Sequence, residues 1–300
     1  MIANDRQFCA RLGGGADGTA GPRASVGNLV WNGREEMNPD AYLTRIGLGR
    51  EQVGADVAGL RTLQRWHLLA APFENLDIHW KRPITIDTAK FYAKIVGEKR
   101  GGFCYELNGA FNELLASLGF NTRLVSARVF NGTDHGPEYD HAAVIVMIGE
   151  DEYLTDVGFG DFTAEPLRLV LDEEQRDAAG VFVTRQFDND YLQVSKRDGD
   201  EWKSQYIFKN IARDPWEFAE MCDYQQYSPD SHFTKGKVCS LMTKNGRKTL
   251  SDRSFIVTAG GERTELPVGS EEEFERILAR EFGIEHADPR ACNQAEGDQR

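Results

Sequence analysis

The 300-residue sequence has no long apolar run, and its basic residues are too few to balance its acidic ones. Lys and Arg number 35 against 48 Asp and Glu, a net charge of −13, which argues against a nucleic-acid-binding protein because such proteins present a basic surface. The longest apolar run, residues 142–148, is far shorter than a membrane span. Because the N-terminus also lacks an apolar signal segment, we expect a cytoplasmic protein that binds neither nucleic acid nor membrane.

Cysteine is scarce as well. The five cysteines are spread along the chain and form no C-x-x-C pair, which argues against a disulfide framework and against a cysteine-rich zinc site. We therefore predict free thiols and no metal or prosthetic group. What the sequence does contain is a hydrophobic content of 40%, including 17 Phe, 9 Tyr and 5 Trp, which is typical of a globular protein with a substantial core.

The pattern of residues changes along the chain. Residues 1–36 are rich in Gly and lack helical or strand periodicity, and their G-x-G-x-x-G match at 13–18 lacks the flanking strand and helix of a dinucleotide site. We predict that they form a disordered extension. Helical periodicity then runs from residue 37 to about residue 120, strand patterns follow, and the last third mixes strands with a terminal helix. This order predicts an α+β fold.

The sequence pattern is clear enough to predict the residue ranges of several helices and strands. The expected helices, bounded by cap and stop residues, cover 57–69, 88–96, 103–118 and 271–282. The expected strands cover 123–130, 142–148, 153–157, 181–183, 191–194, 205–208, 238–243 and 254–257.

Cys104 is a candidate nucleophile. It lies where a loop containing Gly101 and Gly102 enters the helix 103–118, and the N-terminus of a helix stabilises a thiolate. The two glycines allow another backbone or a ligand to approach closely. The alternative is an ordinary buried cysteine. Of the other thiols, Cys222 and Cys239 are expected in the core, and the remaining two, at positions 9 and 292, in the chain tails.

A catalytic cysteine needs a histidine, and the histidine needs a third group to orient it. His141 opens an apolar strand and Asp156 ends the next one, where a buried carboxylate requires a partner. A turn centred on residues 150–151 would place Asp156 opposite Ile145, about 13 Å from His141, so that contact would require a bulge. Spacing alone leaves the contact open. His67 is expected to pack in the core.

Four motifs, in order, resemble the arylamine N-acetyltransferase family. Residues 100–109 read RGGFCYELNG, His141 follows Cys104 by 37 residues, and the DVGFG segment begins 15 residues later at Asp156. Residues 72–76 match PFENL, and residues 228–233 resemble SPxSxF. The usual start of the family aligns with Met37, so the resemblance covers nearly all of the chain after residue 36.

The resemblance implies a helical bundle over residues 37–122, an antiparallel β-barrel over 123–225 and an α/β lid over 226–300, around a core like that of cysteine proteases. It implies a Cys104–His141–Asp156 triad that transfers acetyl from acetyl-CoA by a ping-pong mechanism. The acceptors would be small arylamines, arylhydroxylamines or hydrazines, as in xenobiotic metabolism. His141 would deprotonate Cys104, and Asp156 would hold the imidazolium.

Further site residues follow from the matched motifs. Arg100 and Glu74 are predicted to form an ion pair that braces the cysteine loop, the alternative being two solvated charges worth less than about 1 kcal/mol. Gly102 and Asn108 are expected to support the triad from the same motif. The aromatic residues implied to contact the acceptor are Phe73, Phe103 and Phe159.

One basic segment interrupts this acidic chain. Residues 231–251 contain no Asp or Glu but five basic side chains: Lys235, Lys237, Lys244, Arg247 and Lys248. We interpret the segment as a candidate contact for the phosphates of CoA, the alternative being a solvated hairpin with an Asn245-Gly246 turn. The cofactor-contacting residues that we predict are Tyr224, Ser231, His232, Phe233, Lys235 and Lys237. Glu138 and Asp140 would repel phosphates, so no CoA contact is predicted beside them.

Two other enzyme functions would use the same triad. An amide synthase of the same fold would release or cyclise an acyl chain in natural-product assembly. A papain-like or transglutaminase-like hydrolase is the second, although the local cysteine signatures of those families are absent. The sequence leaves the oligomeric state undetermined.

Overall fold

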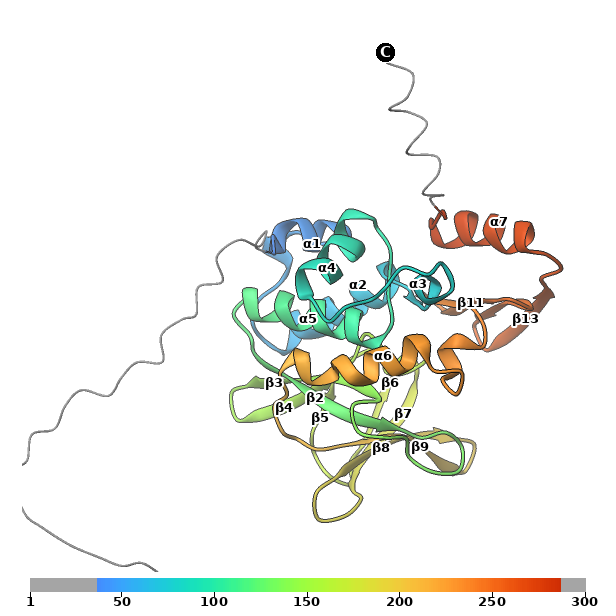
Figure 1. Ribbon diagram of the computed structural model, residues 1–300. Helices are drawn as coiled ribbons and strands as arrows, with labels where there is room; N and C mark the ends of the chain where they lie inside the picture. The colour runs from blue at the N-terminus through green and yellow to red at the C-terminus, as the bar shows by residue number, and fades with distance from the viewer. Residues whose placement is uncertain (1–36, 287–300) are drawn as a thin grey trace, which may run out of the picture. The chain divides into compact units, whose positions relative to one another are not determined.

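A computed structural model gives the structure of residues 37–286. The predicted disordered extension, residues 1–36, lies outside the described residues, as do the cysteines at positions 9 and 292. Across the described part of the chain, the predicted α+β organisation is confirmed: helices predominate first, an antiparallel sheet follows, and a mixed region ends the chain (Figure 1).

The helices begin where the sequence supplies caps. Asn38 caps α1 and Pro39 is its first residue, the side chain of Asp56 accepts the N–H of Gly59 at 2.8 Å in α2, and Asp87 caps α4. The helices are α1 (Pro39–Arg45), α2 (Val57–Ala70), α3 (Leu76–His79), α4 (Thr88–Tyr92), α5 (Cys104–Ser117), α6 (Ala219–Tyr227) and α7 (Glu271–Phe282). A single π-helical turn, Ala93–Gly97, continues α4.

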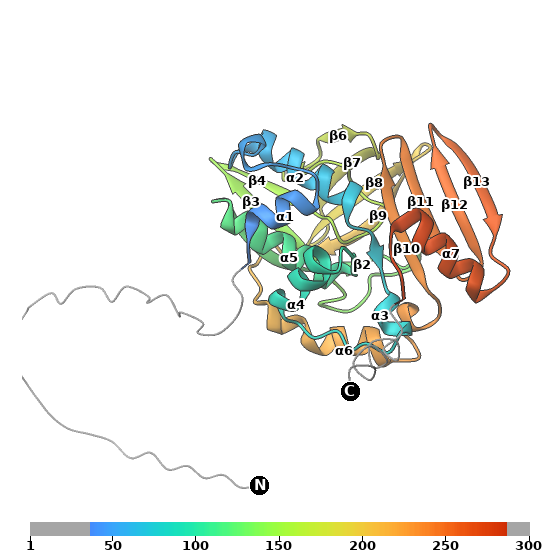
Figure 2. The same cartoon turned by 90° about the horizontal axis from the view of Figure 1, so that it is seen from above.

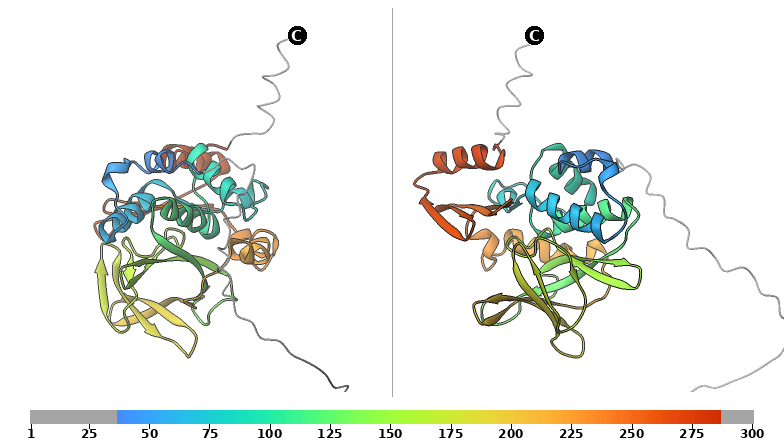
Figure 3. Two further views of the ribbon diagram at one scale, coloured as in Figure 1. Left: turned by 90° about the vertical axis from the view of Figure 1, so that its left-hand side faces the viewer. Right: turned by 180° about the vertical axis from the view of Figure 1, so that it is seen from behind.

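An eight-stranded antiparallel sheet forms the central region. Its strand order is β5-β4-β3-β2-β9-β8-β7-β6. The strands are β2 (Asn121–Val129), β3 (His141–Ile148), β4 (Asp151–Thr155), β5 (Leu167–Arg168), β6 (Glu174–Asp177), β7 (Gly180–Gln186), β8 (Leu192–Asp198) and β9 (Glu201–Phe208). The sheet curves until its two edges meet, where the side chain of Gln175 on β6 bonds both backbone groups of Arg168 on β5, at 2.9 and 2.8 Å (Figure 3). The expected barrel is thus closed by a side chain rather than by a backbone ladder.

A second, five-stranded antiparallel sheet has the order β1-β10-β11-β12-β13. Its strands are β1 (Phe73–Glu74), β10 (Val238–Thr243), β11 (Gly246–Ser251), β12 (Ser254–Ala259) and β13 (Glu262–Pro267). Helix α7 packs across β10 and β11, and its apolar face contributes Phe274 and Leu278 to a core with Cys239 and Leu250 (Figure 2). The short strand β1 comes from the middle of the helical region, so the PFENL segment is joined to the C-terminal sheet.

The expected helices and strands are present with small shifts at their ends, but the turn between β3 and β4 was predicted one residue too late. Ile148 pairs with Asp151, so the turn consists of residues 149 and 150. Gly149 has φ +65°, a left-handed value that glycine accepts without strain. The missed elements are the short helix α3, the helix α6 and the strands β1, β5, β6, β11 and β13. None of these carries a periodic pattern long enough to recognise.

Candidate active site

Cys104 is the first residue of α5, where the helix leaves a loop pinned by another segment of the chain. The N–H of Gly102 donates to the carbonyl of Pro72 at 3.2 Å, and the N–H of Glu74 donates to the carbonyl of Gly102 at 2.9 Å. A Cβ on Gly101 would overlap the carbonyl oxygen of Pro72. Gly101 is therefore required because the backbone of Pro72, just before β1, lies directly against it.

His141 and Asp156 meet across the β3–β4 hairpin. Thr155 pairs with Val144, so Asp156 follows opposite residue 143 and lies diagonal to His141 on the same face. Diagonal neighbours are within reach of long side chains, and His141 Nε2 lies 2.7 Å from Asp156 Oδ2. The register that placed the carboxylate opposite Ile145 was wrong, and no bulge is needed. Both side chains are almost completely buried.

The loop after β4 brings Asp156 up to the cysteine. A Cβ on Gly158 would lie 2.8 Å from the Cα of Cys104, so this close approach needs glycine. The thiol of Cys104 is hydrogen-bonded to the His141 ring. Because Asp156 occupies Nε2, the nitrogen left for the thiol is Nδ1. The three side chains therefore form one chain of hydrogen bonds, and Cys104 is only 3% exposed.

The electrostatics of this chain favour a protonated imidazole. Burial alone would lower the pKa of His141, but the negative charge and hydrogen bond of Asp156, together with the contact to Cys104, raise it to about 10. At neutral pH, His141 is therefore positively charged.

Four donors hold the carboxylate in place. Besides the His141 ring, Asp156 accepts hydrogen bonds from the Tyr206 hydroxyl at 3.2 Å, the Asn108 side chain at 2.8 Å and the N–H of Gly158 at 2.9 Å. The Asn108 side chain also donates to the carbonyl of residue 142 at 2.6 Å and accepts the N–H of residue 157 at 2.9 Å. One turn of α5 thus ties the nucleophile's helix to both strands that carry its partners.

Three half-buried aromatic side chains lie beside His141 or next to the loop before Cys104. The ring of Phe159 lies 5.2 Å from the ring of His141, and Phe73 and Phe233 face each other at 6.0 Å. We call Phe73, Phe159 and Phe233 the aromatic entrance. Phe103 has no exposed surface and packs between Tyr105 and Phe233, so the structure does not support direct contact between Phe103 and an acceptor.

Behind the cysteine loop lies a buried cluster of five charges. Arg100 donates to Glu74 at 2.7 Å and to Asp77 at 2.6 Å. Lys94 lies 2.8 Å from Asp77, 2.9 Å from Glu106 and 3.4 Å from Glu74. Burial raises the pKa of Glu106 to about 7 although Lys94 pulls it down. Because these side chains are at most 10% exposed, Arg100 and Glu74 are not two solvated charges.

Glu106 connects this cluster to the start of the helix that carries Cys104. Its carboxylate accepts the N–H of Phe103 at 3.1 Å, one of the backbone donors left free at the start of α5. Lys94 holds the same carboxylate from the other side. The cluster therefore fixes the loop before Cys104 and the first turn of the helix that carries it.

The predicted cofactor residues fall into two groups. His232, Phe233, Lys235 and Lys237 line one cavity of about 390 Å³. Tyr224, on α6, is 42% exposed and does not line that cavity. The hydroxyl of Ser231 is buried and donates its hydrogen to Gln225. That hydrogen is therefore already engaged within the protein.

The basic side chains of segment 231–251 lie in different surroundings in the structure. Lys237 lies 2.5 Å from Glu271 and 3.4 Å from Asp252, and Lys248 binds the carbonyl of Glu281, so both are already engaged. Lys244 and Arg247 line a different cavity. The expected β10–β11 hairpin is present, but Thr243 pairs with residue 246, so its turn is Lys244-Asn245 rather than Asn245-Gly246.

Comparison with known proteins identifies the family. A profile of N-acetyltransferases matches residues 56–290. The chain is 31% identical over 273 residues to the arylamine N-acetyltransferase pineal gland isozyme NAT-10 of Gallus gallus, covering 83% of this chain and 94% of the relative. The chain belongs to the arylamine N-acetyltransferase family. It is accordingly an acyltransferase.

Solved structures of this family agree. The arylamine N-acetyltransferase of Salmonella typhimurium superposes with a TM-score of 0.77 at 28% identity, covering 86% of this chain and 96% of that one. The Mycobacterium marinum enzyme, determined in complex with CoA, has a TM-score of 0.76 at 27% identity, with coverages of 82% and 93%. The fold and family expected from the four motifs are confirmed.

Sequence reasoning missed several residues of this acyltransferase site. Tyr206 lies in the middle of β9 and Lys94 in the helical turn after α4, and neither stands in a recognisable motif. Asp77 directly follows the PFENL segment, and Glu106 lies inside the cysteine motif as a helix N3 residue, so the capping pattern could have indicated Glu106.

Residues 37–286 contain neither a membrane-spanning helix nor a cluster of metal ligands. No helix in this part of the chain has the length and apolar character needed to cross a bilayer. No group of three or more His, Cys, Asp or Glu side chains in it is placed to hold a metal ion.

Proposed function

We propose that this chain transfers acetyl groups from acetyl-CoA to small aromatic amines and hydrazines through a thioester on Cys104. The observation that carries the proposal is the buried chain of hydrogen bonds from Cys104 through His141 to Asp156. The donor is supported by the CoA complex of the Mycobacterium marinum relative, and the acceptor class by the names of the related enzymes. We place the reaction in the cytoplasm, where the nucleophilic thiol stays reduced.

In the first half-reaction, the Cys104 thiolate attacks the acetyl carbonyl of acetyl-CoA. The new S–C bond forms as the bond from carbon to the CoA sulfur breaks, and the leaving sulfur takes the proton of the His141 imidazolium. Asp156 retains its negative charge and stabilises the imidazolium until that transfer. The products are S-acetyl-Cys104, neutral His141 and free CoA.

In the second half-reaction, the nitrogen of an arylamine or hydrazine attacks the thioester carbonyl. Neutral His141 accepts the proton that the nitrogen loses, and the C–S bond breaks to return the Cys104 thiolate. An arylamine is weakly basic and carries a free lone pair at neutral pH, so it can attack without prior deprotonation. The site is thereby restored to its thiolate–imidazolium state.

The Asp156→Asn variant should lose acetylation rate on the order of a hundredfold at neutral pH. Without the carboxylate, burial dominates and lowers the pKa of His141 from about 10, so the proton needed by the leaving CoA is lost at lower pH. The alkaline limit of the rate should therefore move to lower pH. Stopped-flow release of CoA across pH 6–10.5 measures it. A profile with an unmoved alkaline limit would contradict the role given to Asp156.

The Phe159→Leu variant should discriminate less between acceptors. Phe159 forms part of the aromatic entrance and faces His141, so an acceptor ring can stack on it. We expect kcat/KM for an arylamine to fall up to about tenfold relative to that for a non-aromatic hydrazine. Steady-state rates with both acceptors measure the ratio, and an equal loss for both would show that Phe159 only supports His141.

Intact-mass spectrometry tests the proposed function directly. Incubation with acetyl-CoA should add one acetyl group to the wild-type chain, and addition of an arylamine should remove it. An acetylated chain that no arylamine or hydrazine discharges would instead support an amide synthase. A chain that acetyl-CoA never labels would contradict acetyl transfer and support hydrolysis.

A further inference from the structure

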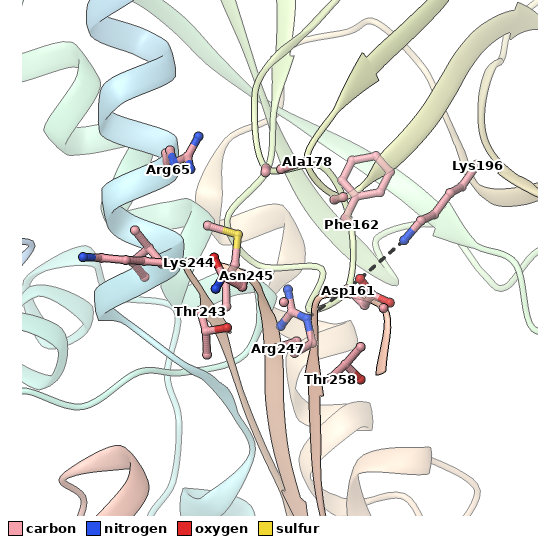
Figure 4. A pocket seen from close by; sticks show the side chains of 16 residues that line it. Arg65, Asp161, Phe162, Ala178, Lys196, Thr243, Lys244, Asn245, Arg247 and Thr258 are labelled. Carbon is pink, nitrogen blue, oxygen red and sulfur yellow. Dashed lines mark hydrogen bonds and ion pairs between the residues drawn. The ribbon is translucent and has the colours of Figure 1, made fainter. Parts of the chain in front are cut away.

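A second cavity, of about 420 Å³, carries a concentration of positive charge that is unusual in this acidic chain (Figure 4). It lies where α2, β8 and the β10–β11 hairpin meet the loop that follows Phe159. Four cationic side chains line it: Arg65, Lys196, Lys244 and Arg247. Among the described residues that line the cavity, Asp161 is the only acidic one. The volume is within the usual range for small-molecule sites.

Two of the cations converge on that single carboxylate. Lys196 Nζ lies 3.4 Å and Arg247 Nε 3.8 Å from Asp161 Oδ1, and Figure 4 shows both side chains directed at it while Lys244 points away. The Asp161 side chain is 72% exposed, whereas those of Lys196 and Arg247 are 23% and 18% exposed. Such long ion pairs to an exposed carboxylate are weak, so a ligand with a higher negative charge can replace Asp161.

The burial of Arg247 supports the same interpretation. Burial lowers its pKa, and the opposite effect of Asp161 does not compensate. The Arg247 guanidinium is largely desolvated, and its counter-charge, Asp161, is distant and exposed. It can therefore pair with an additional anion. Guanidinium groups pair with phosphate oxygens in a planar, two-bond arrangement.

Residues that line the cavity are linked to two rings of the aromatic entrance. Arg247 donates to the hydroxyl of Ser240 at 3.1 Å, and Ser240 pairs with Phe73 in the β1–β10 ladder. On the other side, Phe162 lines the cavity and packs on Phe159 at 5.3 Å. The cavity therefore borders elements that also carry or contact Phe73 and Phe159.

We propose that this cavity binds the phosphate groups of the acyl-CoA donor, with Lys196 and Arg247 as the principal contacts. Arg65 and Lys244 add positive potential, which attracts a polyanion to a chain whose net charge would repel it. This inference rests on the proposed function. It places the phosphates away from Lys237, which is already paired with acidic side chains.

Sequence patterns alone could not delimit this group. Lys244 and Arg247 belong to the basic segment 231–251, but Arg65 comes from α2 and Lys196 from β8. Only the packing of the two sheets and α2 brings the four side chains to one cavity.

The test compares two acetyl donors, acetyl-CoA and S-acetyl-N-acetylcysteamine, a thioester without phosphates. Lys196→Gln and Arg247→Gln should each lower the ratio of kcat/KM for acetyl-CoA to that for the phosphate-free donor by about tenfold, because each removes one partly buried phosphate contact. Asp161→Asn should raise the same ratio, because it removes the competing carboxylate. The opposite signs separate phosphate binding from general damage to the fold.

Arg168→Gln is the matched control. Arg168 lies on β5 and forms an exposed ion pair with Asp151. The substitution removes one positive charge and should leave the donor ratio unchanged. If the ratio falls in Lys235→Gln/Lys237→Gln and stays constant in Lys196→Gln, the inference is overturned and the phosphates bind at the other cavity. If both donors acetylate the chain and no substitution alters the ratio, the inference alone fails. If neither donor acetylates it, the proposed function fails and the inference with it.

Discussion

Cys104→Ser should show no acetyl-enzyme on intact-mass analysis after incubation with acetyl-CoA, and arylamine acetylation should fall by at least about 10³-fold. Nucleophilicity here depends on the thiolate that His141 and the N-terminus of α5 stabilise. A serine hydroxyl is far less acidic and is not ionised by the same surroundings. Because serine differs from cysteine by one atom at a nearly buried position, the fold should be retained.

The control for this experiment is another buried thiol. Cys222 lies in α6, and burial raises its pKa, which makes it a poor nucleophile. Cys222→Ala should therefore still gain one acetyl group and transfer it. An acetylated Cys104→Ser chain, with the label mapped to another residue, would contradict the assignment of the nucleophile.

Arg100→Met should lower the free energy of unfolding by about 3–5 kcal/mol, the usual cost of removing one partner from a buried ion pair. The substitution leaves Glu74 and Asp77 buried with Lys94 as their shared cation. Because Glu74 also accepts the N–H of residue 76 at 2.8 Å, disorder there would extend into the PFENL segment and the loop before Cys104. Urea denaturation followed by tryptophan fluorescence gives the measurement.

Two comparison variants make the result interpretable. Arg168→Met breaks an exposed ion pair with Asp151 and should cost less than about 1 kcal/mol. The double variant Arg100→Met/Glu74→Gln also removes the carboxylate that Arg100→Met leaves without its partner. Its loss of free energy of unfolding should therefore be smaller than the sum of the losses in the two single variants. If Arg100→Met loses no more stability than Arg168→Met, the cluster does not brace the fold.

Much of the site was predictable because its residues are adjacent in the sequence or in recognisable motifs. A glycine pair before Cys104 and a helical repeat after it place the nucleophile at the start of α5. A histidine and an aspartate at the ends of consecutive strands suggest a pair. The contact between the two was predicted only from the family motifs. The predicted β3–β4 turn was one residue too late and placed Asp156 about 13 Å from His141.

Other parts could not be predicted because they depend on contacts between distant segments. The short strand Phe73–Glu74 is too brief to show a pattern, yet its pairing with Cys239 and Ser240 joins the helical region to the C-terminal sheet. Phe103 was expected to contact the acceptor because it stands beside the nucleophile. In the structure its side chain has no exposed surface and packs against Tyr105 and Phe233 instead.

The shortage of basic residues argued against a nucleic-acid-binding role, and the scarcity of cysteine left Cys104 as the candidate nucleophile. By itself, therefore, the sequence determined the family and the α+β order and indicated Cys104 as the candidate nucleophile, since these depend on local pattern and short motifs. Only the tertiary structure decided which charges are buried together behind Cys104 and which cations share a cavity. Burial and charge pairing are set by segments such as α2, β8 and the β10–β11 hairpin, which lie far apart along the chain and become neighbours only when the two sheets pack.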